Sequence, residues 1–413
     1  MSRVVVTGIG GITALGSNWP EIRARLRARR NAVRYMPEWE RLTDLGTRLA
    51  APIDSFEPPA HWTRKQLRSM GRVSQLAVRA GELALADAGL LDDSSIHDGR
   101  MGVACGSCVG STPDIRNFVD MLSTGKSGAL DANSYVRMMP HTAAANVGIF
   151  FSLTGRIIPT SSACTSGSQG IGYASESIRS GRQQMMLAGG AEELCPSEAI
   201  AFDFLYATSR RNDSPQQTPR PYDRNRDGLV IGEGAAMLVL EDRNHALARG
   251  ARIHAEIAGF ASNSDGAHVT RPAEATMRRV MELALEDAGL APGAIGYVNG
   301  HGTATEHGDI AETRATASVF GSRVPLSSQK SYLGHTLGAC GAIEAWLTIE
   351  MMKEGWHAPT INLDAVDPLC GELDYLTGEG RELDVEYSMS NNFAFGGVNT
   401  SLIFGRGDRR AAD

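Results

Sequence analysis

The sequence has no long apolar run, and it has few cysteines for its length. No stretch of eighteen uncharged apolar residues occurs among its 413 residues, so we expect no membrane-spanning helix. Six cysteines in so long a chain do not make a disulfide framework. Cys105 and Cys108 form one C-x-x-C pair, but a structural zinc site needs two further ligands. We interpret the pair as small buried residues in a glycine-rich turn, with a redox dithiol as the alternative.

The sequence also lacks the start of a secreted protein and an excess of positive charge. "MSRVVVTGIGGI" begins as a strand and has no apolar core with a cleavage site, so we expect a cytoplasmic protein. The formal net charge is −7, which argues against nucleic acid or an anionic membrane as a partner. One local exception is the basic segment "HWTRKQLRSMGR" at 61–72.

Strand-like and helix-like segments alternate along the chain, which predicts an α/β protein. The helical patterns at 73–90 and 275–290 end in "ADAGL" and "EDAGL". We interpret this as an internal repeat of two halves, 1–250 and 251–413, although such a helix end is also common by itself. "VVVTGIGGITALG" is not a dinucleotide-binding loop, because Thr13 stands where the third glycine of the fingerprint belongs.

Three separate segments carry reactive side chains in polar or glycine-rich turns. Cys164 lies in "SSACTSGSQGIGYA", after the strand-like "FFSLTGRIIPT" and at the start of a helical pattern. Amides at a helix N-terminus favour thiolate over thiol. His301 lies in "NGHGTATEHGD", and "QKSYLGHTLGACG" holds Lys330 and His335. Each residue alone is more often structural than catalytic, but together they form an acyl-transfer set.

These motifs resemble those of the β-ketoacyl-[acyl-carrier-protein] synthases, of the elongating types I and II. The matching segments are "SSAC", "GHGTAT", "KSYLGHTLGACGAIE", "YDRNRDGLVIGEG" and "NNFAFGGVNTSL", and they extend over essentially the whole chain. "AGGAEELC", "AFDF" and "SDGAHV" lean toward type I. The resemblance implies the thiolase fold, with five layers (αβαβα) in two pseudo-symmetric halves. It also implies a homodimer, or a heterodimer with a related subunit, and no cofactor beyond the phosphopantetheine of acyl carrier protein.

The resemblance further implies roles for individual residues. Cys164 would take the acyl group from a thioester, and the amides of Cys164 and Phe395 would stabilise the oxyanion. His301 and His335 would donate to the enolate formed when malonyl-carrier protein loses CO2, with no separate base for the thiol. Lys330 and Glu344 would orient this set, and Phe395 would gate the acyl pocket.

Substrate and cation positions are likewise implied by the resemblance. The acyl and carrier-arm pocket would include Val109, Phe202, Thr303, Thr305 and Phe393, with the bulk of Val109 limiting chain depth. A small cation or a polar knot is expected at Asn299, Glu312, Glu344, Ser390 and Asn391. Three residues depart from the family pattern: Ala394 replaces a glycine, and Glu306 and His307 replace a proline and a small residue. We expect Ala394 to alter the gate loop and His307 to be loop surface.

The basic segment matches positions where relatives grip the acidic carrier protein. Lys65 and Arg68 lie three residues apart and would share a helix face. Arg64, Arg72 and Lys126 are expected neighbours of this contact.

The expected function is decarboxylative condensation of an acyl thioester with malonyl-acyl carrier protein, as in fatty acid elongation. The alternative within the enzyme class is a ketosynthase of a specialised polyene or polyketide cluster. A non-catalytic chain-length partner would lack the nucleophile, which Cys164 supplies. A thiolase acting on coenzyme A would need a different second cysteine and histidine set.

Overall fold

The computed structural model describes residues 2–407. The strands of the large sheet are β1 (Val4–Thr13), β4 (Met101–Gly106), β5 (Ile157–Pro159), β6 (Met185–Glu192), β8 (Gly234–Asp242), β9 (Ala255–Ser264), β10 (Ile295–Asn299), β11 (Pro325–Ser327), β13 (Asp374–Tyr375), β15 (Tyr387–Ala394) and β16 (Val398–Arg406). Two small sheets hold β2 (Arg34–Tyr35), β3 (Leu49–Ala51) and β7 (Ile231–Gly232), and β12 (Trp356–His357) and β14 (Arg381–Glu382).

The helices fall on both faces of the strands. They are α1 (Trp19–Arg27), α2 (Arg64–Leu67), α3 (Arg72–Asp87), α4 (Thr112–Thr124), α5 (Ala132–Met138), α6 (Thr142–Phe150), α7 (Ser166–Arg179), α8 (Pro196–Asp203), α9 (Arg243–Ala248), α10 (Glu274–Ala288), α11 (Glu306–Phe320), α12 (Lys330–Leu333) and α13 (Cys340–Glu354). None of the described helices is both long and apolar enough to cross a bilayer.

The large sheet shows the same strand order twice. It runs β13-β11-β10-β15-β16-β9-β1-β8-β6-β4-β5, so the order β11-β10-β15-β16-β9 in one half mirrors β5-β4-β6-β8-β1 in the other. The halves meet where β1 pairs antiparallel with β9, from Val4 with Ile257 to Val6 with Ala255. The expected repeat is therefore a structural one, while its boundary at residue 250 stays a prediction.

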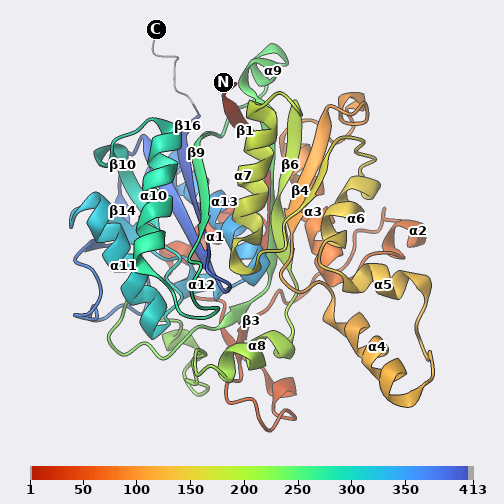
Figure 1. Ribbon diagram of the computed structural model, residues 1–413, viewed down its shortest axis with the longest axis horizontal. Coiled ribbons are helices and arrows are strands. Elements are labelled where there is room, and N and C mark those ends of the chain that lie inside the picture. Colours follow the sequence, from red (N-terminus) through yellow and green to blue (C-terminus); the bar gives the residue numbers. More distant parts are fainter. Residues whose placement is uncertain (1, 408–413) are drawn as a thin grey trace.

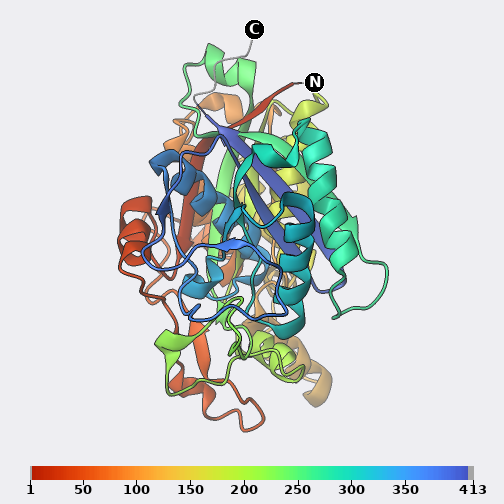
Figure 2. The ribbon, with the colours of Figure 1, turned by 90° about the vertical axis from the view of Figure 1, so that its left-hand side faces the viewer.

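Helices and sheet halves alternate in layers (Figure 1). The helices α7 and α13 contact each other between the two sheet halves, α3 and α6 cover the outer face of one half, and α10 and α11 cover the other. Seen from the side, β1 begins and β16 ends at the same end of the molecule (Figure 2). This is the predicted five-layer architecture of the thiolase fold.

The two "DAGL" helices occupy equivalent places in this repeat. Helix α3 packs on β1 and α10 packs on β9, and each ends before a left-handed glycine, Gly89 at φ 68° and Gly289 at φ 65°. The strand glycines explain the close packing. A Cβ on Gly8 would lie 2.2 Å from the carbonyl oxygen of Ala84, and one on Gly259 would lie 2.5 Å from that of Ala284. Glycine at these sites lets helix and strand backbones approach closely.

Strand β1 continues through its glycines to Thr13. One local expectation needs correction. The apolar segment 150–160 is not one strand: Phe150 ends α6, and only Ile157–Pro159 forms β5. An apolar run of this length does not distinguish a helix end from a strand.

Candidate active site

The three segments with reactive side chains converge at one place. Cys164 follows β5 in a single 3₁₀ turn (Ala163–Thr165), and α7 begins two residues later, so the thiol lies just before the helix. His301 follows β10 after one residue, Gly300. His335 follows α12 after Gly334. All three side chains are buried.

Each of the three segments contains a non-glycine residue with left-handed backbone. Ala163 has φ 52°, Ala304 has φ 63° and Leu337 has φ 45°. Such a conformation costs on the order of 1–3 kcal/mol and persists only where the surrounding structure enforces it. The strain therefore gathers on the turns that carry Cys164, His301 and His335.

The neighbours of His335 determine which of its nitrogens carries the proton. Its Nε2 lies 3.0 Å from the sulfur of Cys164, and the amide of Leu337 donates to its Nδ1 at 3.2 Å. Burial, followed by the charge of Lys330, lowers the pKa of His335 well below its usual value. A neutral imidazole that accepts at Nδ1 carries its proton at Nε2. His335 thus donates to the sulfur and is not a base for the thiol.

His301 is held in the same protonation state by a buried ion pair. Lys330 Nζ lies 3.1 Å from His301 Nδ1 and also bonds Glu344, whose other oxygen accepts from Asn392 at 2.7 Å. Burial, the Lys330 charge and His335 lower the pKa of His301 well below its usual value. His301 Nε2 therefore carries the proton. The predicted orienting role of Lys330 and Glu344 agrees with these contacts.

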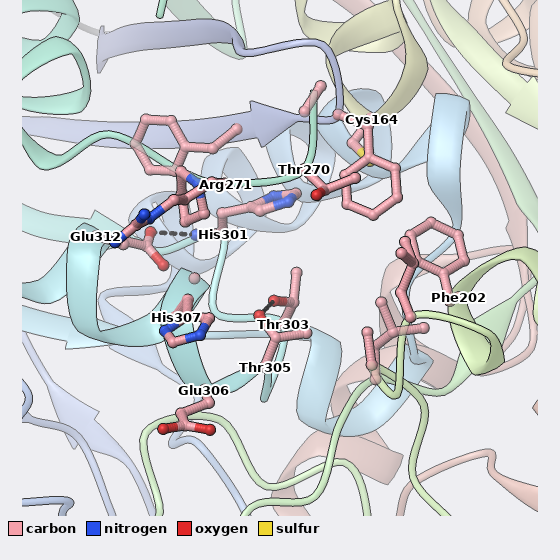
Figure 3. Close-up of a pocket in the computed structure, with 18 of the residues that line it drawn as sticks. Cys164, Phe202, Thr270, Arg271, His301, Thr303, Thr305, Glu306, His307 and Glu312 are labelled. Atoms are coloured by element: carbon pink, nitrogen blue, oxygen red, sulfur yellow. Dashed lines mark hydrogen bonds between the residues drawn. The ribbon is translucent and has the colours of Figure 1, made fainter. Parts of the chain in front are cut away.

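Glu312 fixes the backbone next to His301. One carboxylate oxygen accepts from the amide of His301 at 2.5 Å, shown dashed in Figure 3, and the other accepts from Gly302 at 2.7 Å. Because the carboxylate is buried, burial raises its pKa to about 8. Glu312 thus holds the turn that directs His301.

The expected thiolate at Cys164 needs correction. Burial raises the pKa of Cys164 to about 11, although Lys330 and the amides of Phe395 and Cys164 itself act in the opposite direction. Desolvation of the sulfur outweighs the local donors, so the resting group is a thiol. The amides of Phe395 and Cys164 both favour negative charge on the sulfur, which agrees with the oxyanion donors expected there.

A cavity of about 460 Å³ leads from Cys164 to the surface. Figure 3 shows Cys164 and His301 at one side and Glu306 and His307 at the other, with Thr303 and Thr305 between them. Phe202 and Phe393 also line it, whereas Val109 does not. His307 is exposed, as expected, but it lies in the first turn of α11 and not in a loop, and it lines the mouth of the cavity.

The turn after β15 forms one wall of this cavity. The ring of Phe395 packs on Phe202 with centroids 4.9 Å apart, and its role as a gate stays a prediction. The positive φ angles of the turn fall on Gly396 (86°) and Gly397 (70°), and Ala394 ends β15 without one. The substitution of alanine for glycine at 394 therefore introduces no left-handed strain.

The five cation candidates do not all face one way. Asn299 donates to Ser390 at 3.2 Å, whereas the side chain of Asn391 contacts Met281 of α10. Successive side chains of a strand point to opposite faces, so Ser390 and Asn391 diverge. The side-chain oxygens of Asn299 and Asn391 are buried without a hydrogen-bond partner among the described residues. Such oxygens suit a hard cation, and a cation here stays a prediction.

The carrier-binding candidates lie on the surface, with one exception. Lys65 in α2, Arg68 at its end and Lys126 after α4 are exposed. Arg72 is instead paired with Glu233, at 2.5 Å, and it also lies over the ring of Phe56. We therefore assign Arg72 to the fold and not to the carrier contact.

The structure adds residues that sequence reasoning missed. Asn392 joins Glu344 to His301, and Glu192 bonds both Ser107 and the amide of Gly338. The sequence carried a signal for both residues, because each places a polar side chain in a strand that is buried almost throughout. Cys105 is fully buried in β4, and burial raises its pKa to about 12, which suits the structural interpretation of the C-x-x-C pair.

A cysteine with two neutral histidines at the end of an acyl-sized cavity defines a thiol-dependent acyl-transfer site, and comparisons with known proteins agree. Residues 1–246 match the model of the β-ketoacyl synthase N-terminal domain and residues 254–364 that of the C-terminal domain. The chain is 37% identical to 3-oxoacyl-[acyl-carrier-protein] synthase 2 of Vibrio harveyi, over 97% of this chain and 98% of that protein. It is 36% identical to synthase 1 of Escherichia coli (strain K12), over 98% of each. The chain belongs to the β-ketoacyl synthase family.

Solved structures extend this similarity. A β-ketoacyl synthase from Burkholderia phymatum STM815 is 65% identical with a TM-score of 0.97, covering 98% of this chain and 100% of that one. The ishigamide ketosynthase/chain length factor is 33% identical with a TM-score of 0.90, covering 98% and 99%. The AntDE:AntF structure, an acyl-carrier protein in complex with its ketosynthase, is 30% identical with a TM-score of 0.86, covering 98% and 100%.

Proposed function

We propose that this protein condenses an acyl thioester with malonyl-acyl carrier protein, releasing CO2 and forming a β-ketoacyl-acyl carrier protein. One observation carries the proposal: two neutral imidazoles meet at the sulfur of Cys164, with His335 Nε2 3.0 Å from it and a ring nitrogen of His301 within 4.8 Å of both. Their ring centroids are 5.1 Å apart. Two donors at one point suit an enolate oxygen next to an acyl-cysteine.

The first step transfers the acyl group. The sulfur of Cys164 attacks the carbonyl carbon, a C–S bond forms to the cysteine, and the bond to the carrier thiol breaks. The thiol proton ends on the departing carrier thiol, because the pKa of Cys164 is raised by burial and neither histidine is a base. The amides of Cys164 and Phe395 stabilise the oxyanion of the tetrahedral intermediate.

The second step forms the new carbon–carbon bond. The carboxylate of the malonyl group leaves as CO2, and its bonding electrons form an enolate held by His301 and His335. The enolate carbon attacks the acyl carbon, the C–S bond to Cys164 breaks, and the cysteine regains a proton from solvent. Both steps balance with thioester substrates and this chain's own groups, so the proposal needs no further cofactor.

The proposal includes two protein partners. Acyl carrier protein would dock at Lys65, Arg68 and Lys126, supported by their exposure and by the carrier complex among the structural neighbours. A homodimer is supported by β5, which pairs only with β4 among the described strands and carries an exposed Ile157. Exposed apolar side chains of α4 and α6, Leu122 and Ile149, extend this surface. A cytoplasmic location stays a prediction from the sequence.

Two pathways remain as candidates for the same reaction. Fatty acid elongation is supported by the two curated relatives, and a specialised pathway by the likeness to the ishigamide ketosynthase and by Glu306 and His307 at the cavity mouth. A panel of acyl-carrier thioesters of different length and unsaturation, analysed by intact mass, separates the two. Preference for saturated chains supports elongation, and preference for polyunsaturated or keto-bearing chains supports the alternative.

The reaction itself is tested with the purified protein, a loaded acyl-carrier thioester and malonyl-carrier protein. We expect acylated Cys164, release of CO2 and a product extended by two carbons. Hydrolysis of the thioester without a condensed product would reject the proposal.

A further inference from the structure

Glu192 is a buried carboxylate at the end of β6 that bonds two loops far apart in the sequence. Its Oε1 accepts from the hydroxyl of Ser107 at 2.7 Å and from the amide of Val109 at 3.3 Å. Its Oε2 accepts from the amide of Cys108 at 2.6 Å and from that of Gly338 at 3.0 Å. The side chain is fully buried. All four partners donate hydrogen bonds, so an ionised carboxylate satisfies them and an amide cannot.

The hydrogen bond from the Gly338 amide to Glu192 lies one residue away from the amide that contacts the catalytic histidine. The amide of Leu337, immediately before Gly338, is the donor that keeps the proton of His335 on Nε2. Leu337 has a left-handed backbone, at φ 45°, a conformation that needs support from its surroundings. The main chain of His335 is held separately, through Val230 and Gly232. The direction of the Leu337 amide therefore depends on the anchor at Gly338.

The other two amide donors, Cys108 and Val109, belong to a loop that packs behind the cavity wall. Cys108 packs in one apolar cluster with Phe202, Leu337 and the gate residue Phe395. A Cβ on Gly338 would lie 2.7 Å from the nitrogen of Cys108, so the two loops touch at this point. One side chain thus ties the 107–109 loop to the 335–338 turn.

We propose that Glu192 is a positioning residue for the decarboxylation step, holding the Leu337–Gly338 peptide so that His335 presents Nε2–H to the enolate. The inference rests on the proposed function. Glu192 does not line the cavity, so it would act through the peptide and not by contact with a substrate.

The next residue supplies a matched control. Glu193 directly follows β6 and is also buried, but it bonds Ser111 at 2.7 Å, the amide of Thr112 at 3.0 Å and that of Val73 at 3.3 Å. Glu192→Gln and Glu193→Gln therefore make the same substitution at two adjacent buried positions. Only the first reaches the His335 turn.

The test measures CO2 release from malonyl-carrier protein, acyl loading of Cys164 and thermal stability for both variants. We expect Glu192→Gln to lower the rate of CO2 release about 10- to 100-fold, the range for loss of a group that orients catalytic residues. Acyl loading should fall no more than about 3-fold, because the oxyanion amides do not depend on His335. Glu193→Gln should lower stability without changing the ratio of the two rates. Equal ratios in the two variants would overturn the inference.

A second variant keeps the test decisive if Glu192→Gln does not fold. Ser107→Ala removes one donor to Glu192 and should lower CO2 release about 3-fold with unchanged loading, as expected for one lost hydrogen bond. An unchanged ratio in this variant would also overturn the inference. Failure of the unmodified protein to release CO2 would instead reject the proposed function.

Discussion

The central helices α7 and α13 begin alike in the two halves but do different things. Each follows a 3₁₀ turn whose first residue is left-handed, Ala163 before α7 and Leu337 before α13. The second residue of the turn is Cys164 in one half and Gly338 in the other. The first presents a thiol to the cavity, whereas the second has no side chain and packs against Cys108 and Glu192.

The difference shows how a repeated fold can divide the work of one site. The turn before α7 has space in front of it and carries the nucleophile. The turn before α13 is closed by the 107–109 loop and carries the amide that orients His335. The same kind of 3₁₀ turn thus carries the reacting sulfur in one half and the amide that orients His335 in the other.

The largest expected effect comes from removing the thiol. Cys164→Ala should abolish acyl loading, because Cys164 is the one cysteine among the described residues that lines the cavity. Cys340→Ala removes the cysteine that begins α13 and should still load. Intact-mass analysis after incubation with an acyl-carrier thioester measures both. Stoichiometric acylation of Cys164→Ala would contradict the assignment.

Loss of either histidine should be next in size. His301→Ala or His335→Ala removes one of two enolate donors and should slow CO2 release about 100-fold or more, as for loss of an oxyanion donor. Loading of Cys164 should suffer less, because its donors are backbone amides. Placing these changes in a Cys164→Gln background, which mimics a loaded thioester, isolates decarboxylation. Normal CO2 release in either variant would refute the division of roles.

A methyl group at Gly338 tests the comparison directly. The added Cβ would lie 2.7 Å from the nitrogen of Cys108 and from Glu192 Oε2, so the turn must move. We expect Gly338→Ala to cost about 1–3 kcal/mol of stability, as overpacking does, and to slow CO2 release more than loading. Gly293→Ala, where the Cβ meets nothing within 4 Å, is the control. Equal behaviour of the two variants, measured by Tm and by rates, would mean that the closed turn is not important.

Charge reversal at the docking surface should have a smaller effect. Lys65→Glu with Arg68→Glu should raise the apparent KM for an acyl-carrier substrate about 10-fold at low salt, with a smaller effect at high salt. KM for acyl-pantetheine should not change, because the two side chains are exposed and do not line the cavity. Equal loss with both substrates would mean that these residues support the fold instead.

The smallest effect expected is a pH dependence of stability. Burial raises the pKa of Glu312 to about 8, so the folded protein holds this proton at pH values where the unfolded chain has lost it. Stability should therefore fall as pH rises from about 7.5 to 8.5, a range above the ordinary pKa of histidine in the unfolded chain. We expect Tm to drop by a few degrees, on the order of 1 kcal/mol. Glu312→Gln should flatten this slope, and a Tm that rises over the same range would contradict the argument.

Much of the site followed from local sequence. Cys164, His301, Lys330 and His335 were found from their turns, because reactive side chains at the ends of strands and helices gather at one edge of an α/β sheet. The two long "DAGL" helices were predicted within a few residues, since their apolar spacing and terminal glycines are local signals. The segment 150–160 was misjudged, because an apolar run carries no sign of which partner it packs against.

The sequence by itself determined the family, the alternation of strands and helices, and the residues that react. The tertiary structure decided the state of those residues. Burial makes Cys164 a thiol with a pKa of about 11, and hydrogen bonds from Leu337 and Lys330 determine which nitrogens of the histidines carry protons. The bond between Glu192 and Gly338 joins residues 146 positions apart. Desolvation and such distant contacts depend on how the whole chain packs, so no local pattern specifies them.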